Sequence, residues 1–293
     1  MNSSTQSSHR GGAESEAEPL IDVHAHFFHD RCGRSDWREI NQARLEAGVT
    51  IGISCHVASI LGSWGFTSPA YMPSPQDVGY GNARMMELCE TESARVRCYV
   101  MLNPNDRDRA LHEIEASLAA GAGVVGLKLA ASRRANDMLV DEFISLAEAN
   151  RLPVLHHVWQ HRRRDWPGQE ASDAIELAEL AARHPGVSFI LAHIAGGGDY
   201  SHTFAAVRGT RNILLDISGS GVDRGMLDAA IESVGAERIL WGSDITMETG
   251  LAKLRALAHT GLGADDIAKI RWRNAARIFP AHAFPMIHAG LAR

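Results

Sequence analysis

The chain has 293 residues, of which 45% are hydrophobic and 22% are charged, and its formal net charge is -6 at pH 7. This length and apolar content can bury a sizeable core and fall within the range of a single α/β barrel. The negative charge argues against an electrostatic nucleic-acid binder, and no apolar run is long enough to cross a bilayer.

The N-terminal segment, residues 1–18, is rich in Ser, Gly and Glu and contains no apolar stretch. It lacks the hydrophobic segment of a signal peptide. We expect a disordered tail here, with the folded part of the chain covering residues 19–293. The cysteines form no C-x-x-C pair and suit reduced, mostly buried thiols of a cytoplasmic enzyme; they are Cys32, Cys55, Cys89 and Cys98.

From Pro19 onward, short aliphatic or β-branched runs alternate with segments that have the apolar spacing of a helix. We predict eight strands, over residues 20–24, 49–55, 96–102, 124–129, 153–157, 188–193, 212–217 and 238–243. A final helix is expected from Asp265 toward Phe279. Strands without strict polar alternation, separated by helices, favour a parallel sheet covered on both faces. Eight such units predict a single-domain (β/α)8 TIM barrel with an additional C-terminal helix.

The open doubly wound sheet is the alternative α/β architecture. It is disfavoured because the turn after the first strand carries no glycine-rich nucleotide fingerprint. Histidines occupy that turn instead, at His24 and His26.

Histidines and one aspartate stand at the ends of the predicted strands. His24 and His26 project to the same side of the first strand because alternate residues of a strand face the same way. His157, His193 and Asp244 end or follow the fifth, sixth and eighth strands. Active sites of such barrels lie at the C-terminal ends of the strands. We therefore expect the five side chains to meet in one metal site.

Each of these residues also has a purely structural interpretation. The strand histidines could be satisfied by backbone carbonyls, and His193 could be a buried, hydrogen-bonded histidine. Asp244 could cap the following helix. The common position at strand ends favours the metal site over these alternatives.

Several motifs follow one another in a fixed order along the chain. They are D-x-H-x-H at 22–26, Pro-Val-x-x-His at 153–157, an apolar run into His193 before three glycines, Gly-Ser-Asp at 242–244 and Asn-Ala-Ala-Arg-Ile-Phe at 274–279. Together they resemble the amidohydrolase superfamily, specifically the amidohydrolase-related branch that includes aminocarboxymuconate-semialdehyde decarboxylase. The resemblance covers almost the whole folded chain.

This resemblance implies the roles of the residues at the strand ends. His24, His26, His157 and Asp244 would be metal ligands, Asp244 would also exchange a proton with metal-bound water, and His193 would be an additional catalytic or second-metal residue. Where His156 and His157 stand side by side, counting from Pro153 favours His157 as the ligand, with His156 packing toward the helices. Lys128 ends the fourth predicted strand. Some superfamily members carboxylate a lysine there to bridge two metal ions, whereas this branch often uses a single metal ion.

We expect metal-dependent hydrolysis of a small carbonyl substrate, such as a lactone, amide or ester, by a metal-activated water. Zinc is the expected ion, and manganese and iron suit the same ligands. Asp244 would carry the proton and His193 would hydrogen-bond the developing oxyanion. The alternative is a non-oxidative decarboxylase of a small carboxylated ring or enol on the same site. A non-catalytic binding barrel is disfavoured by the complete acid–base set.

The segment after the fifth strand has the sequence of a possible anion-binding loop. Arg162, Arg163 and Arg164 are flanked by Trp159 and Trp166. Arginines can bind a substrate carboxylate through paired hydrogen bonds, and such a charge run can equally be a solvated loop. The expected partner is a small-molecule substrate, not nucleic acid or a membrane, and a homodimer is left open.

Overall fold

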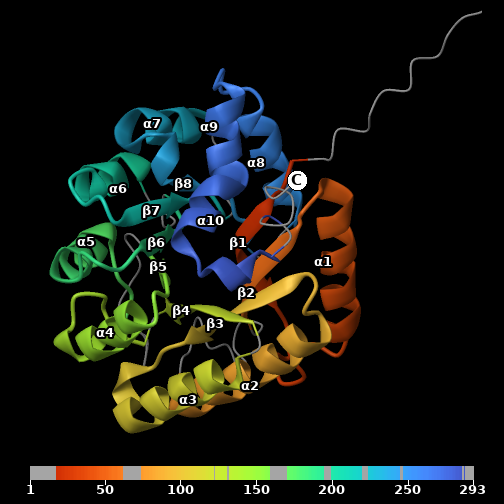
Figure 1. The fold of residues 1–293 in the computed structure, drawn as a ribbon, viewed down its shortest axis with the longest axis vertical. Helices are drawn as coiled ribbons and strands as arrows, with labels where there is room; N and C mark the ends of the chain where they lie inside the picture. Colours follow the sequence, from red (N-terminus) through yellow and green to blue (C-terminus); the bar gives the residue numbers. More distant parts are fainter. Residues whose placement is uncertain are drawn as a thin grey trace, which may run out of the picture.

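A computed structural model describes residues 18–61, 74–121, 123–130, 132–158, 170–194, 199–219, 224–244, 247–285 and 287. The predicted substrate-binding residues Trp159, Arg162 and Arg163 lie outside this described part of the chain. Figure 1 shows the strands gathered at the centre of the molecule and the helices arranged around them.

The eight strands form one parallel sheet in sequence order. They are β1 (Ile21–Phe27), β2 (Cys55–Ile60), β3 (Val96–Met101), β4 (Val124–Leu129), β5 (Val154–His157), β6 (Phe189–Ala192), β7 (Ile213–Asp216) and β8 (Ile239–Leu240). The chain after β8 returns to β1, where the Val23 N–H donates to the Trp241 carbonyl at 3.1 Å and Ala25 forms a parallel bridge with Asp244. These contacts close the sheet and confirm the predicted (β/α)8 barrel.

Helices alternate with the strands and cover the outside of the barrel (Figure 1). The α-helices are α1 (Trp37–Ile51), α2 (Pro75–Thr91), α3 (Arg107–Ala120), α4 (Asp141–Ala149), α5 (Ala174–Arg183), α6 (Tyr200–Val207), α7 (Arg224–Val234), α8 (Met247–Leu257), α9 (Ala264–Ala268) and α10 (Asn274–Ile278). Short 3-10 turns lie at Pro104–Asp106, Met138–Val140, Ala236–Arg238 and Ala281–Ala283.

The predicted C-terminal helix is confirmed, with one irregularity. A π-helical stretch, Lys269–Arg273, joins α9 to α10, so the helical run is continuous from Ala264 to Ile278.

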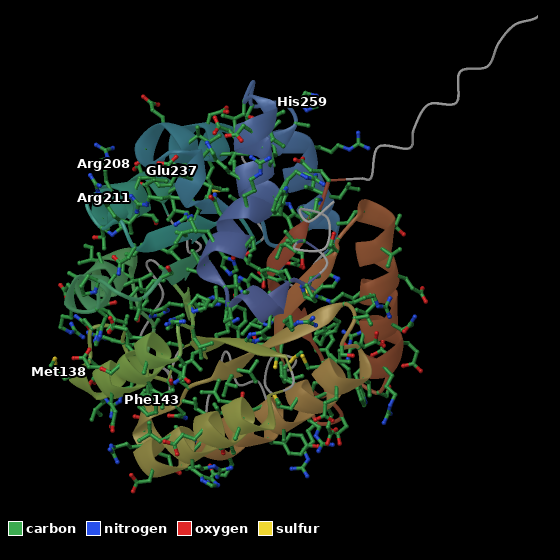
Figure 2. The ribbon with its side chains drawn as sticks, viewed as in Figure 1. Met138, Phe143, Arg208, Arg211, Glu237 and His259 are labelled. Carbon is green, nitrogen blue, oxygen red and sulfur yellow. The ribbon has the colours of Figure 1, made fainter. Side chains whose placement is uncertain are left out.

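Polar side chains such as Arg208 and His259 lie at the outer edge of the molecule, away from the strands (Figure 2). Within the described residues, no helix combines the length and the apolar character that crossing a bilayer requires.

The predicted strand over residues 49–55 is wrong. Residues before Gly52 belong to α1, and β2 begins only at Cys55. The buried residues of α1 recur at helical spacing and are Asn41, Arg44, Leu45 and Gly48, whereas Val49 at the end of the helix is 59% exposed. Gly52, at φ 88°, then ends the helix in the left-handed conformation. Amphipathic packing of the helix overrides the strand propensity of this run.

Alternation along the strands separates two apolar layers. Leu155 belongs to the layer inside the barrel, together with residues such as Ile190. Val154 and Val158 belong to the layer between the strands and the helices. On β5 the inward positions are therefore occupied by Leu155 and, two residues later, by His157.

The C-terminal segment completes the inner layer. Phe279 and Phe284 pack with residues from the first half of the strands, and the rings of Tyr99 and Phe279 are 6.1 Å apart. These apolar contacts fill the end of the barrel at which the strands begin. The opposite end, at which the strands finish, holds the polar side chains described next.

Candidate metal centre

His24 and His26 lie on β1 and meet inside the barrel. Their Nε2 atoms are 3.1 Å apart, and both side chains are buried. Burial lowers the pKa of both imidazoles well below the usual 6.5, and the nearby charge of Lys128 lowers it further. Both rings are therefore neutral at pH 7, which is the form of histidine that binds metals.

The other ring nitrogen of each histidine is held by an oxygen. His24 Nδ1 lies 2.7 Å from Asp216 Oδ2 on β7 and 2.9 Å from Ser218 Oγ. His26 Nδ1 lies 3.2 Å from the Ser59 carbonyl on β2. Carboxylate and carbonyl oxygens are acceptors, so a ring nitrogen that hydrogen-bonds to one must carry a proton. The proton of each ring therefore sits on Nδ1 and the lone pair on Nε2. The two Nε2 lone pairs then face each other. Both are acceptors, so they cannot hydrogen-bond to each other, and a cation between them would bind both.

Asp244 brings a carboxylate to the same place. Its Oδ1 lies 3.4 Å from His26 Nε2, and its Oδ2 lies 3.6 Å from His193 Nε2. The side chain is 14% exposed, so it is within reach of solvent and of a substrate. Ligand atoms of His24, His193 and Asp244 all lie within 4.8 Å of one another, which is a spacing that allows one ion to be shared.

His193 and His157 complete the cluster. The His193 ring stacks on His24 with centroids 5.1 Å apart, and the His157 ring meets His193 edge-on at 4.9 Å. His193 Nδ1 lies 2.8 Å from Ser218 Oγ, the hydroxyl that also contacts His24. Burial, with a smaller contribution from His193, lowers the pKa of His157 well below 6.5. The structure thus brings together all five residues predicted at the strand ends.

His156 has a different environment from its neighbour His157. It shares the outer side of β5 with Val154 and Val158, is fully buried, and its ring nitrogens make no well-formed hydrogen bond with any described residue. Burial lowers its pKa to about 4. The register of β5 therefore presents His157 to the cluster, as counting from Pro153 predicts.

Lys128, at the end of β4, reaches the two histidines of β1. Its side chain is fully buried, and Nζ lies 3.1 Å from His24 Nε2 and 3.3 Å from His26 Nε2. Burial lowers the pKa of Lys128 to about 7, against the opposing effect of Asp244 and Asp216. A protonated Lys128 and a metal ion would therefore compete for the same two lone pairs.

Two glycines make the close packing of the cluster possible. A Cβ at Gly242 would lie 2.5 Å from Asp216 Oδ1 and 3.1 Å from the Cβ of His24. A Cβ at Gly219, where φ is 90°, would lie 2.7 Å from the His193 ring. The glycine of the Gly-Ser-Asp motif is thus explained by the approach of β8 to β1 and β7.

Other residues support the site, although the sequence analysis assigns none of them a role. Asp22 accepts hydrogen bonds from His56 Nδ1 at 2.8 Å and from Ser243 Oγ at 2.6 Å. Arg44, on α1, donates to the Asp244 carbonyl at 2.8 Å. These contacts join segments far apart in the chain. Of these residues, the sequence motifs include Asp22, the first residue of D-x-H-x-H, and Ser243, the middle residue of Gly-Ser-Asp, but neither Arg44 nor His56.

Asp216 and Lys253 are two further buried charges that sequence reasoning did not identify. Asp216 is the last residue of β7 and the penultimate residue of the predicted strand 212–217, so its place near a strand end was the available signal. Lys253, on α8, donates to the Gly219 carbonyl. Burial lowers the pKa of Lys253 to about 8, against the opposing charges of Asp216 and Asp244.

The donor set fits a divalent metal ion. Neutral imidazole nitrogens and a carboxylate oxygen are ligands that zinc, manganese and iron accept. The facing Nε2 lone pairs of His24 and His26, each fixed by an oxygen behind the ring, supply the arrangement such an ion needs. Ligand atoms of His193 and Asp244 lie within 4.8 Å of one from His24, and the His157 ring adjoins that of His193.

Solved structures with the same fold include enzymes of two kinds. A dihydroxybenzoic acid decarboxylase from a Polaromonas species, with bound manganese and the inhibitor 2-nitroresorcinol, is 18% identical, covers 89% of this chain and 96% of its own, and has a TM-score of 0.67. A 5-carboxyvanillate decarboxylase from Sphingomonas paucimobilis is 16% identical, covers 90% of this chain and 99% of its own, and has a TM-score of 0.65. An amidohydrolase from Burkholderia multivorans with bound HEPES is 16% identical, covers 88% of this chain and 98% of its own, and has a TM-score of 0.61.

At such low identity these similarities establish the fold alone. Comparison with curated proteins gives no match. The sequence profile of the amidohydrolase family, in contrast, matches residues 21–281, which include every residue of the cluster. The chain therefore belongs to the amidohydrolase family.

Proposed function

We propose that this chain is a metal-dependent hydrolase of a small carbonyl substrate, such as a lactone, amide or ester. His24, His26, His157 and Asp244 would hold the ion. The observation that carries the proposal is the position of the Asp244 carboxylate, with one oxygen 3.4 Å from His26 Nε2 and the other 3.6 Å from His193 Nε2. One oxygen is thus turned toward the ligand pair and the other toward a possible proton partner.

A bound divalent ion supplies Lewis acidity, which polarises a carbonyl group and acidifies water. Zinc is the proposed ion because imidazole and carboxylate ligands suit it. Manganese is the alternative, since the decarboxylase from Polaromonas contains it.

The residues of the chain divide the remaining work. Asp244 accepts a proton from the attacking water and later delivers it to the leaving group. His193, in its doubly protonated form, donates from Nδ1 to Ser218 Oγ and from Nε2 to the carbonyl oxygen of the substrate, where it stabilises the negative charge that develops. Asp216 keeps His24 in the ligating tautomer.

Decarboxylation of a small carboxylated ring or enol is the second candidate. It is favoured by two buried lysines, Lys128 and Lys253, whose protonated forms suit an anionic substrate. Two of the proteins with the same fold are also named as decarboxylases. In this reaction Asp244 or His193 would deliver a proton to carbon instead of to a leaving group. For either reaction, we propose that Trp159, Arg162 and Arg163 contact the substrate carboxylate.

Product analysis tests the proposal. The chain loaded with Zn²⁺ or Mn²⁺ is incubated in isotopically labelled water with a panel of lactones, amides, esters and carboxylated aromatic rings. Hydrolysis predicts a product that has gained one labelled oxygen, with activity that a chelator removes and the metal restores. Release of carbon dioxide without gain of water would establish the decarboxylase instead. A metal-loaded chain that turns over no member of the panel would contradict both.

A further inference from the structure

Asp244 has a backbone conformation that its residue type disfavours. Its φ is 60°, in the left-handed region, where a residue with a Cβ is uncommon. Such a conformation persists only where surrounding contacts enforce it. The contacts that hold Asp244 therefore determine where its carboxylate lies.

Two hydrogen bonds fix the backbone of Asp244, one through its N–H and one through its carbonyl. The Asp244 N–H donates to the His24 carbonyl at 2.6 Å, which ties it to β1. The Asp244 carbonyl accepts from Arg44 Nη1 at 2.8 Å, although the two residues are 200 positions apart. The residue before it is also fixed, because the Ser243 N–H and hydroxyl both donate to the Asp22 carboxylate. Arg44 is the member of this set that comes from a helix.

Arg44 reaches the site from behind. It lies on the inner side of α1, is 7% exposed, and its guanidinium lies 5.8 Å from the centre of the Phe27 ring. Burial lowers the pKa of Arg44 to about 10, against the opposing charges of Asp22 and Asp244, so the group stays charged at neutral pH. A buried cation is retained here beside the two carboxylates of the seam between β1 and β8.

We propose that Arg44 is a positioning residue for the metal centre, an inference that rests on the proposed function. By holding the Asp244 carbonyl, the guanidinium of Arg44 keeps the left-handed turn and so places the carboxylate between His26 and His193. Arg44 does not touch the metal or the substrate in this arrangement. Its effect on metal binding and on proton transfer comes from the position that it gives to Asp244.

Arg44→Ala tests this inference through metal affinity as well as through activity. Residues that orient metal ligands typically account for 10- to 100-fold in affinity, so we expect the Kd for Zn²⁺, measured by competition with a chromophoric chelator, to rise by roughly that factor. We expect kcat to fall while KM changes little, because Asp244 carries the proton and does not bind the substrate. Added guanidinium should restore part of the Zn²⁺ affinity by refilling the cavity. Arg44→Lys, which keeps the charge, provides a second variant if the alanine variant fails to fold.

Arg238→Ala is the matched control. Arg238 also donates to backbone carbonyls, those of Ile213 and Thr210, but at the opposite end of β7. It should lower the unfolding temperature without changing the Kd for Zn²⁺. Both Arg44 variants binding Zn²⁺ like the parent, with parental kcat, would overturn the positioning role while leaving the metal centre intact. A parent chain that binds no ion would overturn the metal centre and this inference with it.

Discussion

The Nδ1 atom of His24 lies 2.7 Å from the Oδ2 atom of Asp216, although the two residues are 192 positions apart. Both side chains are completely buried. The carboxylate fixes the proton on Nδ1 and leaves Nε2 free to bind a cation. The ligating form of a β1 histidine is thus set by β7.

The contact between these two residues predicts the effect of Asp216→Asn. Asparagine keeps the shape of aspartate but loses the charge that makes His24 a stronger ligand. The Kd for Zn²⁺ should rise by roughly 10- to 100-fold, as measured by chelator competition. Asp199→Asn, at the N-terminus of α6, is the control and should bind Zn²⁺ like the parent. An unchanged Kd in Asp216→Asn would show that Asp216 does not tune the ligand.

The two histidines of β1 should share one ion. His24→Ala and His26→Ala are each expected to lose bound metal and activity together while the circular dichroism spectrum of the barrel is kept. Elemental analysis measures the metal content. His259→Ala, at the outer edge of the molecule (Figure 2), should keep both properties. Full metal content in both β1 variants would exclude these residues as ligands.

Asp244→Asn separates proton transfer from metal binding. Asparagine keeps one coordinating oxygen but cannot accept a proton at neutral pH. General acid–base catalysis contributes on the order of 10²- to 10⁴-fold, so kcat should fall within or above that range while most of the metal is retained. Nearly full activity with bound metal would transfer the proton role to His193.

The arginines after β5 should recognise a carboxylate on the substrate. Replacing Arg162, Arg163 and Arg164 with glutamine removes the paired donors but keeps side chains of similar length. The KM for a carboxylated substrate should rise with little change in kcat, because binding is lost equally in the ground state and the transition state. An uncarboxylated analogue is the control. Equal kinetics for variant and parent would identify the run as a solvated loop.

His156 should make the fold sensitive to acid. Its folded-state pKa of about 4 lies below the usual 6.5. Between these values the unfolded chain binds more protons than the folded chain, so the free energy of unfolding falls as the pH drops, by roughly 3 kcal/mol from this group. His156→Leu removes this contribution. Urea unfolding of variant and parent should therefore diverge as the pH falls from about 6.5 to about 4. Parallel curves would contradict the burial of a neutral imidazole.

The part of the fold that the sequence could predict is the part set by local patterns. Strand alternation separated His156 from His157 correctly, because the two faces of β5 meet different layers. The error at residues 49–55 arose because a run of β-branched residues has the same composition in an exposed helix turn as in a strand. Only the packing of α1 on the barrel decides between them.

The residues at the strand ends were predictable, whereas the side chains that support them from distant segments were not. D-x-H-x-H places His24 and His26 by alternation alone. The partnership of Asp216 with His24, and of Arg44 with Asp244, depends on the register of the closed barrel and on the docking of α1. No spacing along the chain encodes these contacts.

The 2.6 Å hydrogen bond from Asp244 to the His24 carbonyl lies across the line where the last strand meets the first. Neither side of this line holds a complete ligand set, because β1 contributes the paired imidazoles and the β8 end contributes the carboxylate. A folding intermediate in which the barrel is still open would thus lack the site. Capture of a metal by the refolding chain would report on ring closure, separately from the formation of the individual βα units.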